Sequence, residues 1–225
     1  MGRKLNKIVF SLLVAVFCTG ALPAETLIYK EVTGNDTVNL SFTVTPNNTG
    51  YLLKGTAAGK DFIENRIIEM DKELSTVSWN YSNSKEKTEI TSKKEETRLL
   101  VNGKFKNKKY SKAIAIEKYP LKQMFPYSLE SFVRSNENSL IFWIVNPADM
   151  EPVNMIASKK SVETITLNGK PVETWFVRIT ITGWKGKLWH ANAWFRKADG
   201  RYLKYVGAKG PPGAPLCTIT LAEEK

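Results

Sequence analysis

The sequence predicts a mainly β protein, in which a single antiparallel sheet curls into a half-barrel or open barrel around one short mid-chain helix. Three observations support this fold class. Short runs in which apolar and polar residues alternate recur along most of the 225 residues. Turn residues separate these runs at short intervals, as in an antiparallel meander and unlike a parallel βαβ sheet. One stretch, residues 121–133, instead has the three- and four-residue spacing of an amphipathic helix.

Strand signals follow one another along the chain. Val38–Val44 alternates apolar and polar side chains, which is the signature of a half-buried strand. The turn cluster Pro46–Gly50 comes next, and Tyr51–Thr56 is the returning strand. Similar runs predict strands, in order, at Phe62–Met70, Thr76–Tyr81, Lys87–Ser92, Glu96–Val101, Lys104–Lys106, Tyr110–Glu117, Leu140–Val145, Val153–Ser158, Val162–Leu167, Val172–Thr182, Leu188–Arg196, Arg201–Val206 and Leu216–Leu221.

Three dipeptides between these runs are typical of tight hairpin turns. Each combines glycine with a residue that also tolerates a positive φ angle, which two-residue hairpin turns require. We therefore expect hairpins to close at Asn102-Gly103, Asn168-Gly169 and Asp199-Gly200.

The helical stretch lies near the middle of the chain. Pro126 cannot sit deep inside a helix, because its ring removes a hydrogen bond and clashes with the preceding turn. We expect a short turn before Pro126 and a helix of about two to three turns after it. The strands on either side then form one continuous sheet that curls around the apolar face of this element, which consists of Leu121, Met124, Phe125, Leu129, Phe132 and Val133.

The N-terminus has the layout of a secretory signal peptide. A basic start is followed by the apolar run Ile8–Phe17 and by the small-residue stretch Thr19–Ala24. The run is too short to span a bilayer, which requires about 20 apolar residues. We expect cleavage after Ala24, with Ala21 as the second choice. The expected mature chain, residues 25–225, is a single β-rich domain with no transmembrane segment, located in the periplasm or outside the cell.

Composition excludes several classes of function. The chain has one His and two Cys, too few for most metal clusters, disulfide frameworks or Cys/His nucleophile pairs, so neither a metal nor a cofactor is expected. It contains no phosphate-binding glycine loop, nucleophile elbow or HExxH motif, so an enzyme is not expected either. His190 is the one distinctive candidate for the least favoured interpretation, a hydrolase acting on envelope glycans or lipids. Three units of the net charge of +11 belong to the signal peptide, and no nucleic-acid recognition module is visible.

The aromatic residues suggest a ligand. Five of the six tryptophans lie in the second half of the chain, and tryptophan provides a large contact area with a single N–H donor. A curled sheet with a helix across its concave face leaves a cavity for an apolar or amphipathic, lipid-like ligand. The competing interpretation is that these rings fill the core of a large sheet. The candidate ligand-binding residues are Trp143, Trp175, Trp184, Trp189, Trp194, Met124, Phe125, Leu129 and Phe132.

Basic residues are concentrated in the first half of the chain. One interpretation is a solubilising surface whose edge lysines prevent strand-to-strand aggregation. The other is a docking surface for an anionic component of the cell envelope, on a structural module with a filled core. The candidate docking residues are Lys104, Lys106, Lys108 and Lys109.

The C-terminal part of the chain resembles that of some exported bacterial proteins in families of unknown function. The resemblance is carried by Trp189-x4-Trp194-Phe195-Arg196-Lys197-x-Asp199-Gly200-Arg201-Tyr202-Leu203-Lys204-Tyr205-x-Gly207, followed by Gly210-Pro211-x-Gly213-x-Pro215 and a final strand. The coarse plan, with Met124-Phe125-Pro126 at the entry of the helix, also resembles the lipoprotein carrier LolA and its half-barrel relatives. This resemblance implies binding of a lipid or a lipid-anchored protein on a concave apolar sheet closed by a helix, and it implies no catalytic residue.

Overall fold

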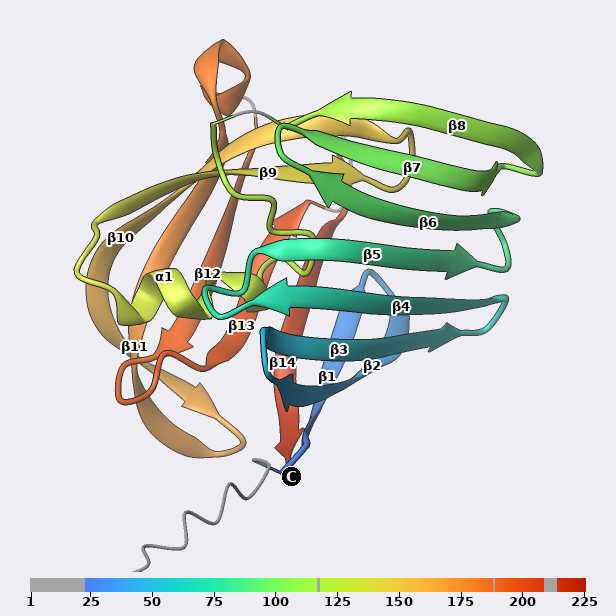
Figure 1. Cartoon of the computed structure of the whole chain (residues 1–225). Coiled ribbons are helices and arrows are strands. Elements are labelled where there is room, and N and C mark those ends of the chain that lie inside the picture. Colours follow the sequence, from blue (N-terminus) through green and yellow to red (C-terminus); the bar gives the residue numbers. More distant parts are fainter. Residues whose placement is uncertain (1–22, 117, 188, 209–213) are drawn as a thin grey trace, which may run out of the picture.

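The computed structural model describes residues 23–116, 118–187, 189–208 and 214–225. Fourteen strands in these ranges form one antiparallel sheet, which does not close by strand pairing (Figure 1). The predicted fold class is therefore confirmed. The strands are β1 (Glu25–Thr33), β2 (Asp36–Asn47), β3 (Gly50–Gly59), β4 (Phe62–Asp71), β5 (Thr76–Asn83), β6 (Thr88–Glu95), β7 (Arg98–Phe105), β8 (Lys108–Ala115), β9 (Ser139–Asn146), β10 (Glu151–Leu167), β11 (Lys170–Ile181), β12 (His190–Arg196), β13 (Tyr202–Ala208) and β14 (Leu216–Glu224).

The order of the sheet follows the chain outward from its centre. The first strand, β1, pairs with β2 on one side and with the last strand, β14, on the other. Successive antiparallel hairpins continue from β2 to the edge strand β8, and from β14 back to the edge strand β9. Figure 1 shows how the sheet curls until β8 lies beside the β9–β10 hairpin. At this seam Lys112 of β8 forms an ion pair of 2.8 Å with Glu151 of β10.

The segment 120–123 bridges part of the gap between the two halves of the sheet. Its backbone pairs with Trp143 of β9 through two hydrogen bonds of 2.8 Å, and the Leu121 carbonyl accepts a 2.7 Å hydrogen bond from the Thr76 amide of β5. The Gln123 side chain extends this pairing, because it accepts from the Val145 amide at 2.9 Å and donates to the Val145 carbonyl at 2.8 Å. These bonds satisfy edge backbone groups that strand pairing leaves open.

The helical element closes one end of the barrel. A 3-10 turn, η1 (Tyr127–Leu129), leads directly into α1 (Glu130–Arg134). The Ser131 hydroxyl donates to the carbonyl of Glu73 in the β4–β5 turn, and Glu130 accepts a 2.9 Å hydrogen bond from the Tyr202 amide at the start of β13. Because these contacts join the two halves of the sheet, α1 fixes the curl of the sheet at this end.

The core lies inside the curled sheet. Alternate residues of each strand point inward, as in any pleated strand. On the central strand β1, Leu27 and Tyr29 are fully buried. The Tyr29 hydroxyl donates to the Tyr202 carbonyl at 3.0 Å, and the two tyrosine rings stack with centroids 5.0 Å apart. The centre of the sheet is therefore held together by side chains as well as by the pairing of β1 with β14.

The two strands predicted on either side of Asn102-Gly103 form one strand, β7. The predicted hairpin at Asn102-Gly103 is wrong, because β7 runs through both residues and the chain turns at Lys106 and Asn107, with φ angles of 50° and 64°. Gly103 has a φ of 137°, and a Cβ there would lie only 2.2 Å from the Glu89 carbonyl oxygen. Glycine therefore permits a close approach of two strands at this position.

The remaining local predictions have mixed outcomes. Asn168-Gly169 does close the β10–β11 hairpin, with φ angles of 50° and 77°, and Gly200 lies in the β12–β13 turn with a φ of 76°. The two strands predicted at residues 153–158 and 162–167 are one strand, β10, with an irregular register between Lys159 and Ser161. The helical element that follows Pro126 has the expected length of about two turns, with three residues in η1 and five in α1.

The central strand β1 was not predicted. The apolar and polar residues of β1 do not alternate clearly in the sequence. Its outer face carries the apolar residues Ile28 and Val32, and its inner face includes the charged residue Glu31. The predicted signal peptide falls almost wholly on residues 1–22, which lie outside the described part of the chain. Within the described residues, no helix has the length and apolar character needed to cross a membrane.

Candidate functional site

A cavity of about 990 Å³ lies inside the curled sheet. Strands from both halves of the sheet line it, together with residues 123–127 of the segment that leads into η1. Its lining includes Phe62 beside the β3–β4 turn and Pro147 to Asp149 of the β9–β10 turn. Consecutive turns of an antiparallel meander lie at opposite ends of its strands, and α1 contacts the β4–β5 turn. The β3–β4 turn therefore lies at the other end of the barrel, which α1 leaves uncovered, and the cavity extends toward this end.

The walls of this cavity are mainly apolar. Several apolar side chains that pack against the core and line the cavity are only half-buried. Part of each side chain is therefore exposed to the lumen of the barrel and not to the outer surface. These residues are Val38, Phe62, Phe125, Ile144, Val153, Ile181, Trp189 and Ile219.

Three of the nine predicted ligand-binding residues line the cavity. Met124 and Phe125 contribute to it from the segment before η1, and the Phe125 ring meets the Tyr205 ring edge-on at 5.9 Å. Trp189 contributes from the start of β12, where its indole nitrogen donates to the Ala208 carbonyl at 3.3 Å. Leu129 and Phe132 are buried in the core around the helical element, outside the cavity lining.

The other four predicted tryptophans lie elsewhere. Trp194 lies on the outer face of β12, beside Phe176 with ring centroids 5.5 Å apart, and Trp184 in η2 (Gly183–Lys187) is 71% exposed. Trp175 packs near the helix, because Lys159 lies over both its ring and that of Phe132. Trp143 sits on the outermost strand, β9, where its backbone pairs with residues 120–122.

One tryptophan that the sequence interpretation left out does line the cavity. Trp79 of β5 is 1% exposed, and its indole nitrogen has no hydrogen-bond partner among the described residues. Its burial follows from the β4–β5 register, which places Trp79 opposite the buried Ile68. Trp79 and Tyr81 alternate with polar residues in the predicted strand Thr76–Tyr81, and this pattern indicates that both rings face inward. The sequence interpretation instead selected the tryptophans that are concentrated later in the chain.

A charged cluster extends from the inner faces of β4 and β5. Glu64 and Arg66 form an ion pair along β4, and both line the cavity. The second carboxylate oxygen of Glu64 accepts hydrogen bonds from the Tyr81 hydroxyl at 3.0 Å and from the Asn83 amide at 3.3 Å. Burial, reinforced by the charge of Glu64, raises the pKa of Tyr81 well above its ordinary value. Tyr81 therefore remains a protonated donor to the carboxylate.

A second polar group lies on the central strands. Glu31, Tyr205 and Ile219 share one row of the sheet, because β14 places Ile219 between the other two. Burial, together with nearby Cys217 and Glu31, raises the pKa of Tyr205 above its usual range. Tyr202 is 1% exposed and lines the cavity, and its hydroxyl has no hydrogen-bond partner within the described residues. The lumen thus combines apolar walls with two separate polar patches.

The helix end of the barrel carries a dense ion-pair network. Arg201 contacts Glu130 at 3.3 Å and Glu224 at 3.2 Å, and it also pairs with Glu25. Glu130 is nearly fully buried, and burial raises its pKa from 4.5 to about 7 despite the opposing charge of Arg201. Nearby, burial lowers the pKa of Lys122 from 10.5 to about 8, while its ammonium group donates to the Glu73 carbonyl. This network anchors α1 and does not line the cavity.

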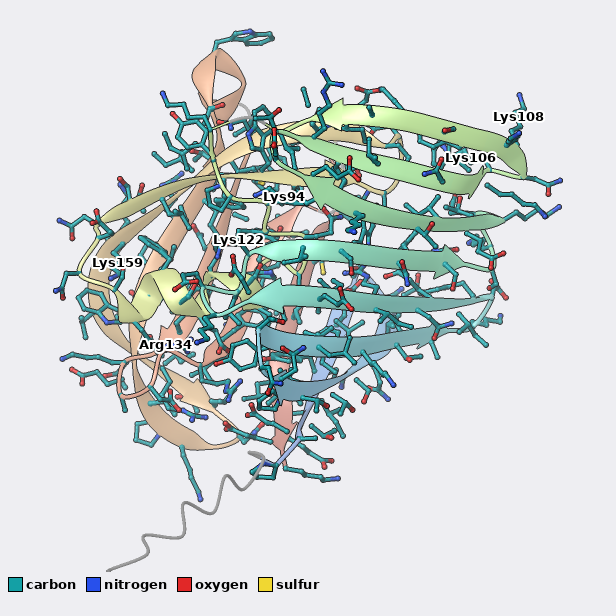
Figure 2. The ribbon with its side chains drawn as sticks, in the orientation of Figure 1. Lys94, Lys106, Lys108, Lys122, Arg134 and Lys159 are labelled. Carbon is teal, nitrogen blue, oxygen red and sulfur yellow. The ribbon has the colours of Figure 1, made fainter. Side chains whose placement is uncertain are left out.

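The predicted docking lysines lie apart from the cavity. All four, Lys104, Lys106, Lys108 and Lys109, are exposed on the β7–β8 hairpin, and Figure 2 shows Lys106 and Lys108 at its tip. Lys104 and Lys109 are direct cross-strand partners. His190 is exposed at the start of β12, next to the cavity-lining Trp189.

The fold and the cavity define a β-barrel-like protein with an internal, mainly apolar cavity. No family model matches the chain, and no curated protein matches it. Among solved structures it is similar to a beta-barrel-like protein of the domain of unknown function DUF1849 from Brucella abortus, with 10% identity, coverage of 92% of this chain and 98% of that chain, and a TM-score of 0.62.

Two further solved structures align over most of this chain. One is the hypothetical lipoprotein YmcC from Escherichia coli, with 12% identity, coverage of 91% of this chain and 89% of that chain, and a TM-score of 0.39. The other is a LolA superfamily protein from Nitrosomonas europaea, with 7% identity, coverage of 90% and 84%, and a TM-score of 0.28. The DUF1849 likeness shows the shared fold, in agreement with the sequence resemblance to a family of unknown function.

Proposed function

We propose that this protein binds an apolar or amphipathic, lipid-like molecule inside its barrel, in the periplasm or outside the cell. The observation that carries this proposal is the cavity of about 990 Å³ with mainly apolar walls. Ligand pockets typically measure about 300–1,000 Å³ and combine apolar walls with a few polar groups. The N-terminal pattern of a signal peptide supports the proposed location.

Two neighbouring alanines of β3 allow a matched test. Ala57 lines the cavity, whereas Ala58 is exposed on the opposite face of the same strand. Ala57→Trp places a large ring in the lumen, and Ala58→Trp adds the same ring to the outer surface. We expect Ala57→Trp to weaken the binding of a neutral fluorescent reporter, N-phenyl-1-naphthylamine, by about tenfold or more, and Ala58→Trp to leave it unchanged.

Native mass spectrometry provides an independent measurement. Wild-type protein purified under mild conditions is expected to carry a co-purified lipid-sized mass that Ala57→Trp lacks. Circular dichroism checks that both variants fold. The proposal fails if the wild type neither carries such a mass nor binds the reporter, or if the two variants bind the reporter equally well.

A further inference from the structure

The distribution of charge in the cavity differs between its two walls. Among the described residues that line the cavity, Arg66 is the one cation, and it lies on β4. Glu31 lies on β1, which two intervening strands separate from β4. With neighbouring strands about 4.8 Å apart, these two side chains originate at well-separated positions on the sheet. A ligand inside the barrel therefore meets a cationic and an anionic region at different places.

The guanidinium of Arg66 retains donors for a ligand. Among the described residues, Arg66 donates a hydrogen bond to Glu64 from Nη2, and its Cζ atom lies over the Tyr81 ring, 5.9 Å from the ring centroid. A guanidinium has five N–H donors in a planar fork, so the donors on Nε and Nη1 remain. The side chain is 27% exposed although it points into the barrel, so these donors reach the lumen.

The partner Glu64 is already well supplied with donors. Tyr81 and Asn83 both donate to the carboxylate oxygen that does not face Arg66. Among the described residues, three side chains therefore stabilise the negative charge of Glu64, whereas Arg66 keeps donor positions that these residues do not fill. An additional acceptor, above all one with two oxygens in a plane, matches the geometry that the guanidinium offers.

The neighbours of Arg66 on this wall of the cavity are Gly55 and Trp79. Gly55 is its cross-strand neighbour on β3 and lines the cavity, and the ring of Phe42 lies over this glycine, 3.0 Å from the position that a Cβ would take. On the other side, Trp79 lies one inward position further along β5, with its ring 5.5 Å from that of Tyr81. The Trp79 indole nitrogen is buried, has no hydrogen-bond partner within the described ranges and belongs to the same wall of the cavity.

We propose that the ligand has an oxyanion head group, a carboxylate or a phosphate, which Arg66 binds in the lumen through the donors on its Nε and Nη1. This inference rests on the proposed function. The apolar tail of the ligand then lies along the half-buried wall formed by Ile144, Val153 and Ile219. Glu31 and Asp149 also line the cavity, and an oxyanion head group is favoured beside the cation Arg66 over a position beside either carboxylate.

The test compares four ligands that share one alkyl chain. Dodecanoate carries a carboxylate, dodecyl phosphate a phosphate, dodecanol a neutral hydroxyl and dodecyltrimethylammonium a cation. Each is used to displace the neutral reporter N-phenyl-1-naphthylamine from full-length protein, below the micelle-forming concentration. We expect at least one oxyanion to bind about tenfold or more tightly than dodecanol, because hydrogen bonds to charged groups are the stronger ones. A preference for dodecanoate points to a fatty acid, and a preference for dodecyl phosphate to a phospholipid-like source.

Variants assign the preference to Arg66. Arg66→Met keeps the length of the side chain but removes its charge and donors, and it is expected to abolish the preference for oxyanions while dodecanol binding changes little. The double variant Arg66→Met with Glu64→Gln avoids leaving the buried carboxylate of Glu64 without Arg66, so it tests the same point with both charges of this ion pair removed. Lys54→Met is the matched control, because Lys54 is an exposed cation on the outer face of the adjacent strand β3.

The outcomes separate this inference from the proposed function. If dodecanol or dodecyltrimethylammonium binds as tightly as both oxyanions, or if the double variant keeps the oxyanion preference, the head-group assignment is overturned while the cavity remains a binding site. If none of the four compounds displaces the reporter from the wild type, both proposals fail.

Discussion

Glu130 at the start of α1 makes stability depend on pH. Its carboxylate is nearly fully buried, and Arg201, its nearest cation at 3.3 Å, is shared with Glu25 and Glu224. Burial therefore outweighs the ion pair and raises the pKa of Glu130 from 4.5 to about 7. In the unfolded chain the same group loses its proton near its ordinary pKa. Between these two values the folded protein holds a proton that the unfolded chain has released.

The sign and the size of the effect follow from this difference. A state that binds more protons is favoured at low pH, so the contribution of Glu130 to stability falls as the pH rises from about 4.5 through about 7. Each pKa unit corresponds to about 1.4 kcal/mol, so the full loss is about 3 kcal/mol. Glu130→Gln does not titrate and retains an acceptor for the Tyr202 amide. We expect this variant to gain about 3 kcal/mol relative to the wild type between pH 4.5 and pH 8.

Urea unfolding at a series of pH values measures this difference, and Glu89→Gln on the exposed side of β6 is the control for a change of charge alone. The relative gain is expected to grow steadily between pH 4.5 and about pH 7 and to level off above pH 7. Parallel profiles for wild type and Glu130→Gln contradict the reasoning. A wild type that gains stability relative to the variant as pH rises contradicts it more strongly, because the ion pair with Arg201 then outweighs burial.

Three further predictions concern the sheet and its surface. Gly103→Ala is expected to destabilise the protein by about 3 kcal/mol or more in urea unfolding, because a Cβ at this position meets the backbone of β6. Gly34→Ala has open space around its Cβ and is expected to cost about 1 kcal/mol. Equal costs for the two variants contradict the close-approach argument. Leu27→Ala on the buried face of β1 is expected to lower the free energy of unfolding by about 2–5 kcal/mol, and Ile28→Ala on its other face is expected to lower it clearly less. Similar losses of stability in the two variants contradict the assignment of the inner face. Co-sedimentation with anionic vesicles is expected to fall when glutamine replaces the four lysines of the β7–β8 hairpin, which are Lys104, Lys106, Lys108 and Lys109. The control variant carries glutamine at four exposed lysines elsewhere, Lys30, Lys54, Lys60 and Lys170, and is expected to sediment like the wild type. Equal binding by both variants refutes the docking hypothesis.

Most of the strands could be predicted because alternation and turn chemistry are local properties. Asn168-Gly169 forms the expected hairpin, since both residues adopt the positive φ angles that such a turn requires. Asn102-Gly103 has the same chemistry but lies within β7, where the approach of β6 determines the conformation of Gly103. A short-range signal cannot distinguish these cases, because the deciding contact is with another strand.

The candidate site was harder to predict than the strands. Met124, Phe125 and Trp189 line the cavity, and their role in binding a ligand stays a prediction. Trp194 and Trp79 both lie on well-predicted strands, yet Trp194 faces outward and Trp79 faces the lumen. Alternation shows that neighbouring residues point to opposite faces without showing which face is the inner one, particularly where both carry large side chains.

The sequence by itself determined that this chain forms a curled antiparallel sheet with one short helical element, because alternation, turn residues and helical spacing act over a few residues. Only the tertiary structure decided that β1 and β14 meet at the centre, that the segment 120–123 bridges the gap, and that a cavity lies between the two halves. These features depend on pairings between residues far apart in the chain. The placement of Arg66 beside Gly55 is of the same kind, because it follows from the β3–β4 register inside the curled sheet.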